Sequence, residues 1–201
     1  MTPTPMLQPS QSHDHRQRLV PPAALILRRA SGYLELGELL LEGEAAAPPT
    51  ACRLFARSLA ELNQLDAAAR GEAAASLLEG EALRALGEWE AAIGPLTRAA
   101  EATPGHVEAW LGLGWCHKRL GDLDAAIDSL RRGLAVFPDQ PILHYNLACY
   151  HSLAGSVPAA IEQLTRAIAI DDRFRDLTGD ERDFDAIRSD PRFVAATSVT
   201  V

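Results

Sequence analysis

The stretch from 107 to 140, VEAWLGLGWCHKRLGDLDAAIDSLRRGLAVFPDQ, decides the fold of this 201-residue chain. In its first half, side chains suited to packing recur at intervals of three and four residues, which is the spacing of one face of an α-helix. They are Trp110, Leu113, Gly114 and His117. The first half of the stretch therefore predicts one amphipathic helix.

A turn and a second helix follow in the same stretch. Gly121 can adopt the left-handed conformation that ends a helix, and the side chain of Asp122 can cap the next one. Pro138 then ends the unit, because proline lacks an N–H and disfavours helix at the residue before it. The apolar face of the second helix consists of Ala126, Ile127, Leu130 and Leu134. The stretch therefore predicts a helical hairpin.

The same hairpin occurs three times at a period of 34 residues, in 73–106, 107–140 and 141–174. Small residues and leucines fall in register along all three units, and a period in this range is typical of a helical solenoid. The positions that match are Gly80, Gly114 and Ala148; Gly87, Gly121 and Gly155; Leu96, Leu130 and Leu164; and Ala99, Gly133 and Ala167.

The pattern of Trp110, Leu113, Gly114, Ala126, Leu130 and Pro138 resembles the tetratricopeptide repeat (TPR), a helix–turn–helix unit of 34 residues. The resemblance covers 73–174 and implies an all-α, right-handed superhelix. It is weaker in the outer units, where Ser76 and His144 replace the usual aromatic residue and Asp172 replaces the closing proline. Because this fold serves many partners, the resemblance predicts the architecture more sharply than the function.

The flanking segments fit around such an array. Residues 1–22, rich in Pro, Ser, Gln and Thr, predict a flexible N-terminal segment, and 23–72 predicts divergent helices that cap the first clear unit. Within this region we expect one helix over 23–36 and another over 51–69. The remainder, 175–201, resembles the tails that follow the last repeat in bacterial TPR proteins, and we expect it to cover the exposed end of the array. The side chains expected to do so are Phe184, Ile187 and Phe193.

Composition and charge exclude several classes of protein. Apolar residues make up 47% of the chain and charged residues 23%, which fits a globular protein. The net charge of −8 argues against a nucleic-acid ligand, and no apolar run is long enough for a membrane span. The three cysteines lack the spacing of a disulfide framework or a zinc site. We therefore expect a cytoplasmic protein with reduced thiols.

The resemblance implies that the first helices of the repeats line a concave face. Their outward stripe carries aromatic and aliphatic groups with a few charges, which suits a peptide-binding groove. The predicted groove residues are Leu77, Glu81 and Arg84; Leu111, Trp115 and Lys118; and Ile142, Tyr145 and Cys149. Of these, Trp115 and Tyr145 are the predicted anchors. The alternative is that the protein's own N-terminal segment or a second subunit covers this face.

Other site chemistries find little support. Some TPR proteins hold the C-terminal carboxylate of heat-shock chaperones with lysine, arginine and asparagine side chains. The matching positions here are Leu77, Glu81, Gly112, Ile142 and Asn146, and none of them is basic. His117, His144 and His151 lie at packing positions, so we expect buried histidines rather than a metal site. We expect no cofactor.

The sequence therefore predicts a non-enzymatic module that binds a peptide or protein partner in a concave groove. No motif offers a nucleophile together with its base. Two alternatives are a small acidic chaperone, similar to the TPR chaperones of bacterial secretion systems, and a structural protein that self-associates into a homo-oligomer.

Overall fold

The fold is built from helices, in agreement with the all-α prediction. The computed structural model describes residues 21–41 and 47–198, and within these ranges it contains no strand. The predicted flexible segment 1–22 therefore lies almost entirely outside the described residues. The helices are α1 (Ala23–Glu38), α2 (Pro49–Leu62), α3 (Ala67–Gly71), α4 (Ala73–Ala85), α5 (Trp89–Ala102), α6 (Val107–Arg119), α7 (Leu123–Val136), α8 (Pro141–Leu153), α9 (Val157–Ile170), α10 (Arg173–Leu177), the 3₁₀ turn η1 (Arg182–Phe184) and α11 (Pro191–Thr197).

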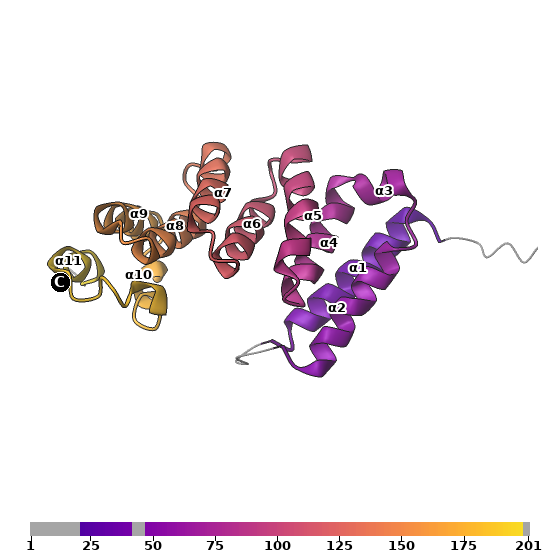
Figure 1. Cartoon of the computed structure of the whole chain (residues 1–201), viewed down its shortest axis with the longest axis horizontal. Helices are drawn as coiled ribbons and strands as arrows, with labels where there is room; N and C mark the ends of the chain where they lie inside the picture. The colour runs from indigo at the N-terminus through magenta and orange to yellow at the C-terminus, as the bar shows by residue number, and fades with distance from the viewer. Residues whose placement is uncertain (1–20, 42–46, 199–201) are drawn as a thin grey trace, which may run out of the picture.

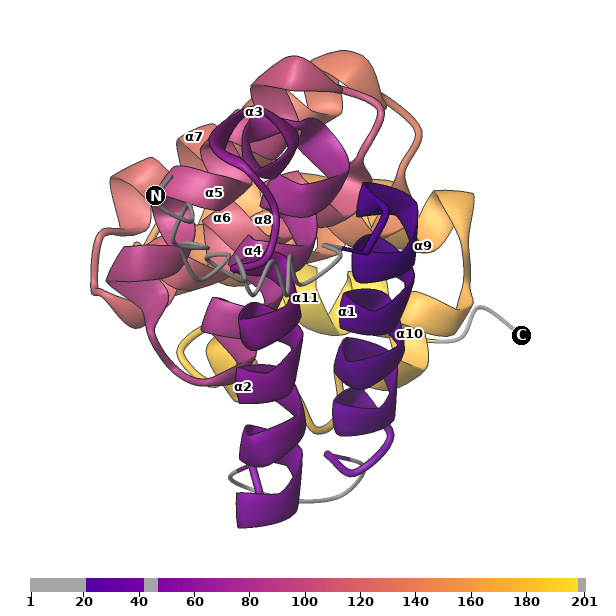
Figure 2. The same ribbon diagram turned by 90° about the vertical axis from the view of Figure 1, so that its right-hand side faces the viewer.

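The helices stack as a row of hairpins from one end of the molecule to the other (Figure 1). The pairs α4–α5, α6–α7 and α8–α9 correspond to the three units predicted from the sequence period. Each second helix packs against the first helix of the next pair, α5 on α6 and α7 on α8. The view along the row shows α1 and α2 side by side in front of the later helices (Figure 2). This arrangement is an α-solenoid.

Glycine allows the two helices of a pair to pack closely. A Cβ atom on Gly80 would lie 2.5 Å from Cγ of Leu96, and one on Gly114 would lie 3.0 Å from Cδ2 of Leu130. The shared Gly and Leu positions of the repeat are therefore the two sides of one contact. The turns are also equivalent, because Gly87, Gly121 and Gly155 have φ values of +81°, +83° and +71°. Glycine adopts this left-handed conformation without the steric cost that a Cβ would add.

The N-terminal helices α1 and α2 form a further hairpin that continues the row. Gly37 lies where α1 crosses α2, and a Cβ on it would be only 2.4 Å from Cε1 of the buried Phe55. The prediction of a helix over 23–36 is confirmed, because α1 covers all of these residues and ends at Glu38. The prediction of one helix over 51–69 was wrong. The chain leaves the helix after Leu62, buries Leu65, and begins α3 at Ala67. The side chain of Asp66 caps this helix by accepting a hydrogen bond from the Ala69 N–H at 2.9 Å.

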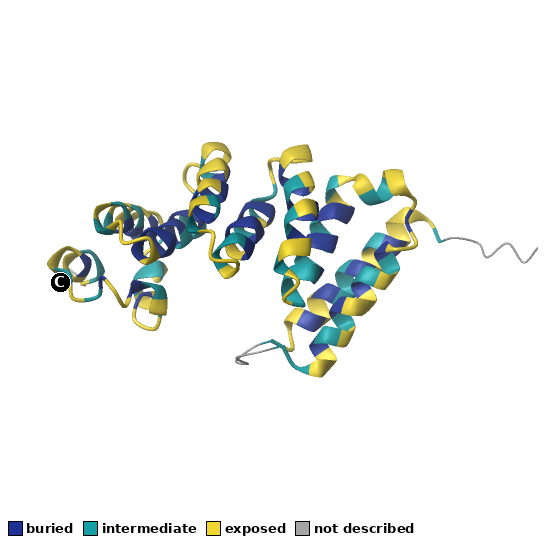
Figure 3. Ribbon diagram, in the orientation of Figure 1, coloured by how far each residue is buried: buried dark blue, intermediate teal, exposed yellow. Residues whose placement is uncertain are grey.

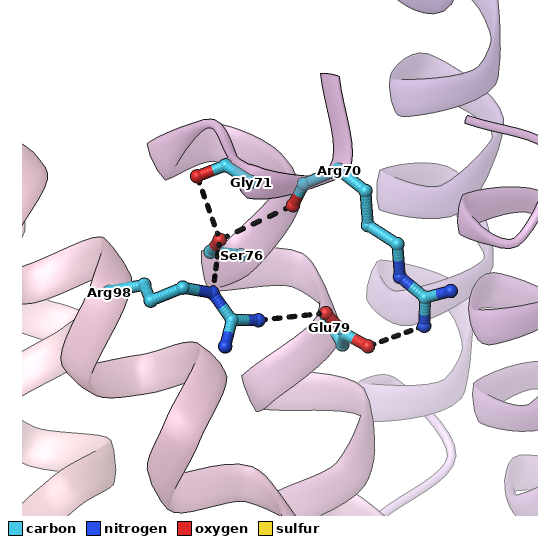
Figure 4. Close-up of polar contacts among 5 residues, drawn as sticks. All are labelled: Arg70, Gly71, Ser76, Glu79 and Arg98. Atoms are coloured by element: carbon cyan, nitrogen blue, oxygen red, sulfur yellow. Dashed lines mark hydrogen bonds and ion pairs between the residues drawn. The ribbon is translucent and has the colours of Figure 1, made fainter. Parts of the chain in front are cut away.

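A polar cluster joins this N-terminal region to the regular repeats (Figure 4). Glu79 on α4 accepts hydrogen bonds from Arg70 of α3 at 2.6 Å and from Arg98 of α5 at 3.3 Å. The hydroxyl of Ser76 lies within hydrogen-bond distance of Arg98 Nε and of the carbonyl oxygens of Arg70 and Gly71. Ser76, where the repeat usually has an aromatic residue, therefore belongs to a polar joint.

The C-terminal segment folds back over the last repeat. Phe184, Ile187 and Phe193, the three side chains predicted to cover that end, are all buried, and they belong to the same core cluster as the repeats. Asp190 caps α11, because its carboxylate accepts a hydrogen bond from the Arg192 N–H at 2.8 Å and Pro191 follows at the first position. Buried residues consequently lie between the helices up to this end, and exposed ones lie on the outer turns (Figure 3).

Candidate functional site

A hollow with a volume of about 380 Å³ lies on the face formed by the first helices of successive pairs. It takes residues from four helices, α1, α4, α6 and α8, so the N-terminal pair contributes to it as a repeat would. The residues that line it are Glu38, Glu81, Arg84, Glu108, Leu111, Gly112, Trp115, Ile142, Asn146 and Tyr150. Five of the nine predicted groove residues are among them.

One repeat position brings several of these side chains to the same face. Glu38, Glu81 and Trp115 each directly follow the glycine at which the paired helices meet. In α8 the equivalent residue is Cys149, which follows Ala148. Because the helices stack in register, this position forms a ladder along the array. The ladder is acidic on α1 and α4 and aromatic on α6.

At the acidic end, Glu81 and Arg84 form a hydrogen-bonded ion pair. Arg84 donates from Nε at 2.9 Å and from Nη2 at 2.6 Å, both to Oε2 of Glu81. Burial works against the charge of Arg84, yet the neighbouring Glu81 carboxylate more than offsets this, and the pKa of the guanidinium is raised above its ordinary value. The pair is therefore a fixed feature of the hollow's wall.

Gly112 makes room for the Glu81 carboxylate against the backbone of α6. A Cβ atom at Gly112 would lie 2.7 Å from Oε1 of Glu81 and 3.1 Å from Cδ1 of Leu96. Oε1 of Glu81 therefore lies next to bare backbone, whereas Arg84 binds only Oε2. Gly112 is one of the five positions compared with the chaperone-type clamp, and in this structure it has a steric role.

Glu38 adds a second carboxylate at this end. Its pKa is raised above the ordinary value, first because neighbouring atoms partly exclude water from it and next because Glu81 adds negative potential. Glu108, at the start of α6, adds a third carboxylate. The lining of the hollow therefore carries three carboxylates and one guanidinium, and its net charge is negative.

The rest of the hollow is apolar and aromatic. Trp115 is 40% exposed, which is unusual for so large a side chain, and Leu111 and Ile142 are half-buried beside it. Tyr150 is almost completely buried and contributes the floor. The ammonium of Lys118 lies 5.4 Å from the centre of the Trp115 ring and 5.6 Å from that of Tyr150, within cation–π range.

Tyr145 and Cys149 do not lie on an open groove, which corrects the prediction that Tyr145 is an anchor. Tyr145 is only 6% exposed and Cys149 only 2%. The Tyr145 ring centre lies 5.2 Å from that of Phe174 in α10 and 5.7 Å from that of Phe184 in the C-terminal tail. The protein's own tail covers this end of the stripe. The prediction had named the N-terminal segment or a second subunit as the alternative cover.

The two remaining predicted residues also lie outside the hollow. Lys118 forms an ion pair with Asp183 of the tail, and both side chains are largely buried. Leu77 is half-buried and packs against the main core cluster. The structure thus brings together Glu81, Arg84, Leu111, Trp115 and Ile142 and separates the other four from them.

No metal chemistry follows from the clusters in the described part of the chain. Ligand atoms of Cys149, Glu181 and Asp183 lie within 4.8 Å of one another. However, Lys118 already supplies a cation to Asp183. Burial, together with the charges of Glu181 and Asp183, raises the pKa of the Cys149 thiol, so at neutral pH it is protonated rather than a thiolate ligand.

The histidines pack as expected. His144 and His151 are buried and His117 is half-buried. His144 replaces the aromatic residue of the repeat and is held at both ring nitrogens, with Nδ1 2.7 Å from Oε1 of Gln163 and Nε2 2.9 Å from the carbonyl oxygen of Pro138. Its role is therefore structural.

Sequence reasoning missed Glu38 and Tyr150 as residues of the hollow, and it left Glu108 out of the predicted set. A signal for Glu38 was present, because Glu38 follows Gly37 as Glu81 follows Gly80. Tyr150 gave no such signal. It follows the ladder position of α8 and reaches the hollow from beneath Trp115 and Lys118.

Comparison with known families agrees with this architecture. The tetratricopeptide repeat family model matches residues 77–133 and 117–173. The chain is a tetratricopeptide repeat protein. The repeats of this class form an all-α solenoid, and this fold suggests a protein-interaction scaffold. Among proteins of curated function, none matches the sequence.

Several solved structures of MamA share the fold. The MamA RS-1 ArsTM double mutant is 18% identical with a TM-score of 0.59, and the match covers 84% of this chain and 89% of that one. The MamA MSR-1 C2 structure is 21% identical with a TM-score of 0.55, covering 75% and 94%. At these identities the likeness establishes the arrangement of helices alone. In the described part of the chain, no helix has both the length and the apolar character needed to cross a bilayer.

Proposed function

We propose that the protein is a non-enzymatic scaffold that binds a peptide segment of a partner protein in the hollow between α1, α4, α6 and α8. The observation that carries this proposal is Trp115. It is a large aromatic side chain, 40% exposed, at a hollow built by four consecutive helical pairs. Partly exposed aromatic residues in such hollows are typical centres of protein–protein binding energy.

The chemistry of the thiols supports a binding role over a catalytic one. Cys116 and Cys149 are buried, and burial raises the pKa of Cys116 to about 11. A thiol with so high a pKa is almost entirely protonated at neutral pH and is a poor nucleophile. All three cysteines are free, in keeping with the proposed reducing, cytoplasmic setting.

The test compares capture of partner proteins by the wild type and by a Trp115→Ala variant. We expect the variant to keep its fold, checked by circular dichroism, and to lose the partner. A Leu120→Ala variant removes a similarly exposed side chain that does not line the hollow, and it should retain the partner. Equal capture by all three proteins would overturn the assignment of the hollow.

The same variants also distinguish which kind of partner occupies the hollow. A small chaperone would yield an unstable client that stays soluble only with the wild type. Self-association through the hollow would show as a Trp115-dependent change in mass with concentration, measured by sedimentation. Either result would redefine the partner and keep the hollow as the binding surface.

A further inference from the structure

The hollow changes character along the row of helices. The ladder position carries Glu38 on α1, Glu81 on α4 and Trp115 on α6. Leu111 and Ile142 lie on the side of α6 and α8, towards the C-terminal end. A ligand that lies along the array therefore meets Glu38 and Glu81 over the first two pairs, Glu108 at the start of α6, and apolar groups over the rest of α6 and α8.

The negative charge at the acidic end is only partly compensated within the described residues. Arg84 binds Oε2 of Glu81 and leaves Oε1 next to Gly112. For Glu38 and Glu108, no basic side chain among residues 21–41 and 47–198 lies within ion-pair distance. The pKa of Glu38 is raised, first by partial burial and next by the negative charge of Glu81.

Lys118 does not neutralise this end, because its charge is already used elsewhere. It pairs with Asp183 of the tail and lies over the rings of Trp115 and Tyr150. The ammonium therefore lies beside the aromatic residues of the hollow, although Lys118 does not line the hollow itself. A ligand with positive charge is attracted to the opposite end, where Glu38 and Glu81 lie, and Glu108 adds a further negative charge to the same hollow.

We propose that the occupant is an extended peptide segment with an arginine or lysine close in sequence to a large apolar residue. The basic group lies against Glu38 and Glu81, with Glu108 adding negative charge to the hollow, and the apolar side chain packs on Trp115 with Leu111 and Ile142. This inference rests on the proposed function of the hollow and names the chemistry of its ligand. Charge complementarity selects this occupant, because the acidic end repels a segment rich in Asp or Glu.

The surface continues beyond the apolar end. Ile142 also borders a second hollow of about 390 Å³, whose wall includes Pro141, Phe174 and Leu177. A segment anchored at Trp115 can therefore extend towards α10, where further apolar residues find contacts. The order of the ligand is then a basic residue over α1 and α4, an apolar residue over α6, and a second apolar residue beyond Ile142.

The experiment selects binders from a random twelve-residue peptide library displayed on phage, with the full-length wild-type chain as bait. Binders that also select on the Trp115→Ala variant are discarded, so the remaining pool depends on the hollow. We expect this pool to be enriched in Arg and Lys next to large apolar residues. Replacement of the basic residue by Gln in a selected peptide should weaken binding about tenfold, as charge-assisted contacts require.

A charge-neutral variant of the acidic end is the matched test. Glu38→Gln with Glu108→Gln should weaken binding of the basic peptide about tenfold and leave the Gln-substituted peptide unaffected. Glu90→Gln with Asp128→Asn removes the same amount of charge from the second helices α5 and α7 and should change neither affinity. The Glu81 side chain is left intact because it holds Arg84.

The outcomes separate the two levels of the proposal. A pool that depends on Trp115 but lacks basic residues, or a basic peptide indifferent to Glu38 and Glu108, overturns the charge inference and leaves the groove standing. The absence of any Trp115-dependent binder overturns the proposed function itself. Rising salt should weaken only the binding of the basic peptide, because ions screen exposed charges.

Discussion

The two ends of the array are finished in different ways. At the C-terminal end, the repeats and the tail share one core cluster that extends from Ala92 to Phe193. At the N-terminal end, α1 and α2 pack through two small separate clusters, one around Ile26 and Leu62 and the other around Leu34 and Phe55. Both ends bury large side chains, but only at the C-terminal end is the buried core continuous with that of the repeats.

This contrast teaches which end is closed and which is available. The tail covers Tyr145 and Cys149, so the stripe of the last repeat is filled by the chain itself. The N-terminal pair instead brings Glu38 to the hollow and leaves the neighbouring Trp115 exposed. In a solenoid each pair contacts only its neighbours, so the end with the smaller clusters is expected to open first.

The largest effect is expected from breaking the closed end. Phe184→Ala removes a fully buried ring that contacts Tyr145 and Phe193, and we expect the free energy of unfolding to fall by ~3–5 kcal/mol. Urea denaturation measures this change. Leu177→Ala, at an exposed position of the same tail, should cost little. A loss below ~1 kcal/mol for Phe184→Ala would mean that the tail does not share the core of the repeats.

The open end has its own weak point at the crossing of α1 and α2. Gly37→Ala places a methyl group 2.4 Å from the Phe55 ring, and overpacking of this kind should cost ~1–3 kcal/mol. Gly32→Ala lies on the same helix with nothing within 4 Å, and it should stabilise by up to ~1 kcal/mol through helix propensity. Thermal denaturation of the two variants tests whether the first is destabilised and the second stabilised. Equal values would show that α1 and α2 separate freely.

A smaller effect tests how the tail is tied to the array. Lys118→Met removes the ion pair with Asp183, whose side chains are only 20% and 14% exposed, and we expect a loss of ~1–2 kcal/mol. A double-mutant cycle with Asp183→Asn isolates the pair. The prediction fails if the coupling energy is zero, because the tail would then be held by its aromatic contacts alone.

The smallest effect sharpens the electrostatic difference between the ends. The pKa of Glu38 in the folded chain lies above its ordinary value of 4.5, so the folded state binds more protons than the unfolded state in that window. Stability is therefore lost as pH rises through the folded pKa of Glu38. Glu38→Gln should add less than ~0.5 kcal/mol at pH 7 and nothing below pH 4. Denaturation curves at the two pH values measure this, and an equal gain at both would contradict the assignment.

The repeats could be predicted from sequence because their signals are local. Gly121 and Asp122 fix a turn and a cap within two residues, and the structure shows φ of +83° and a hydrogen bond from the Ala125 N–H at 3.0 Å. The period of 34 then places equivalent residues on one face. Glu81, Arg84 and Trp115 followed from this register alone.

What could not be predicted depends on contacts distant in sequence. The burial of Tyr145 requires the tail to fold back and place Phe184 against it. The break after Leu62 follows from the burial of Leu65 among α1 and α4 side chains, which no local pattern reveals. Glu38 reaches the hollow because α1 and α2 stack as a further pair, and within this divergent pair only the match of Gly37 and Glu38 to Gly80 and Glu81 indicates the register.

The joint at α3 has a consequence for how the recognition surface is tuned. Residues 63–72 separate α2 from α4, whereas only 103–106 and 137–140 separate the corresponding later helices. Glu79 accepts hydrogen bonds from Arg70 in this longer connection and from Arg98 in α5, and none of these three residues lines the hollow. Lengthening or shortening this connection would shift Glu38 relative to Glu81 and alter the preferred ligand while every wall residue is retained.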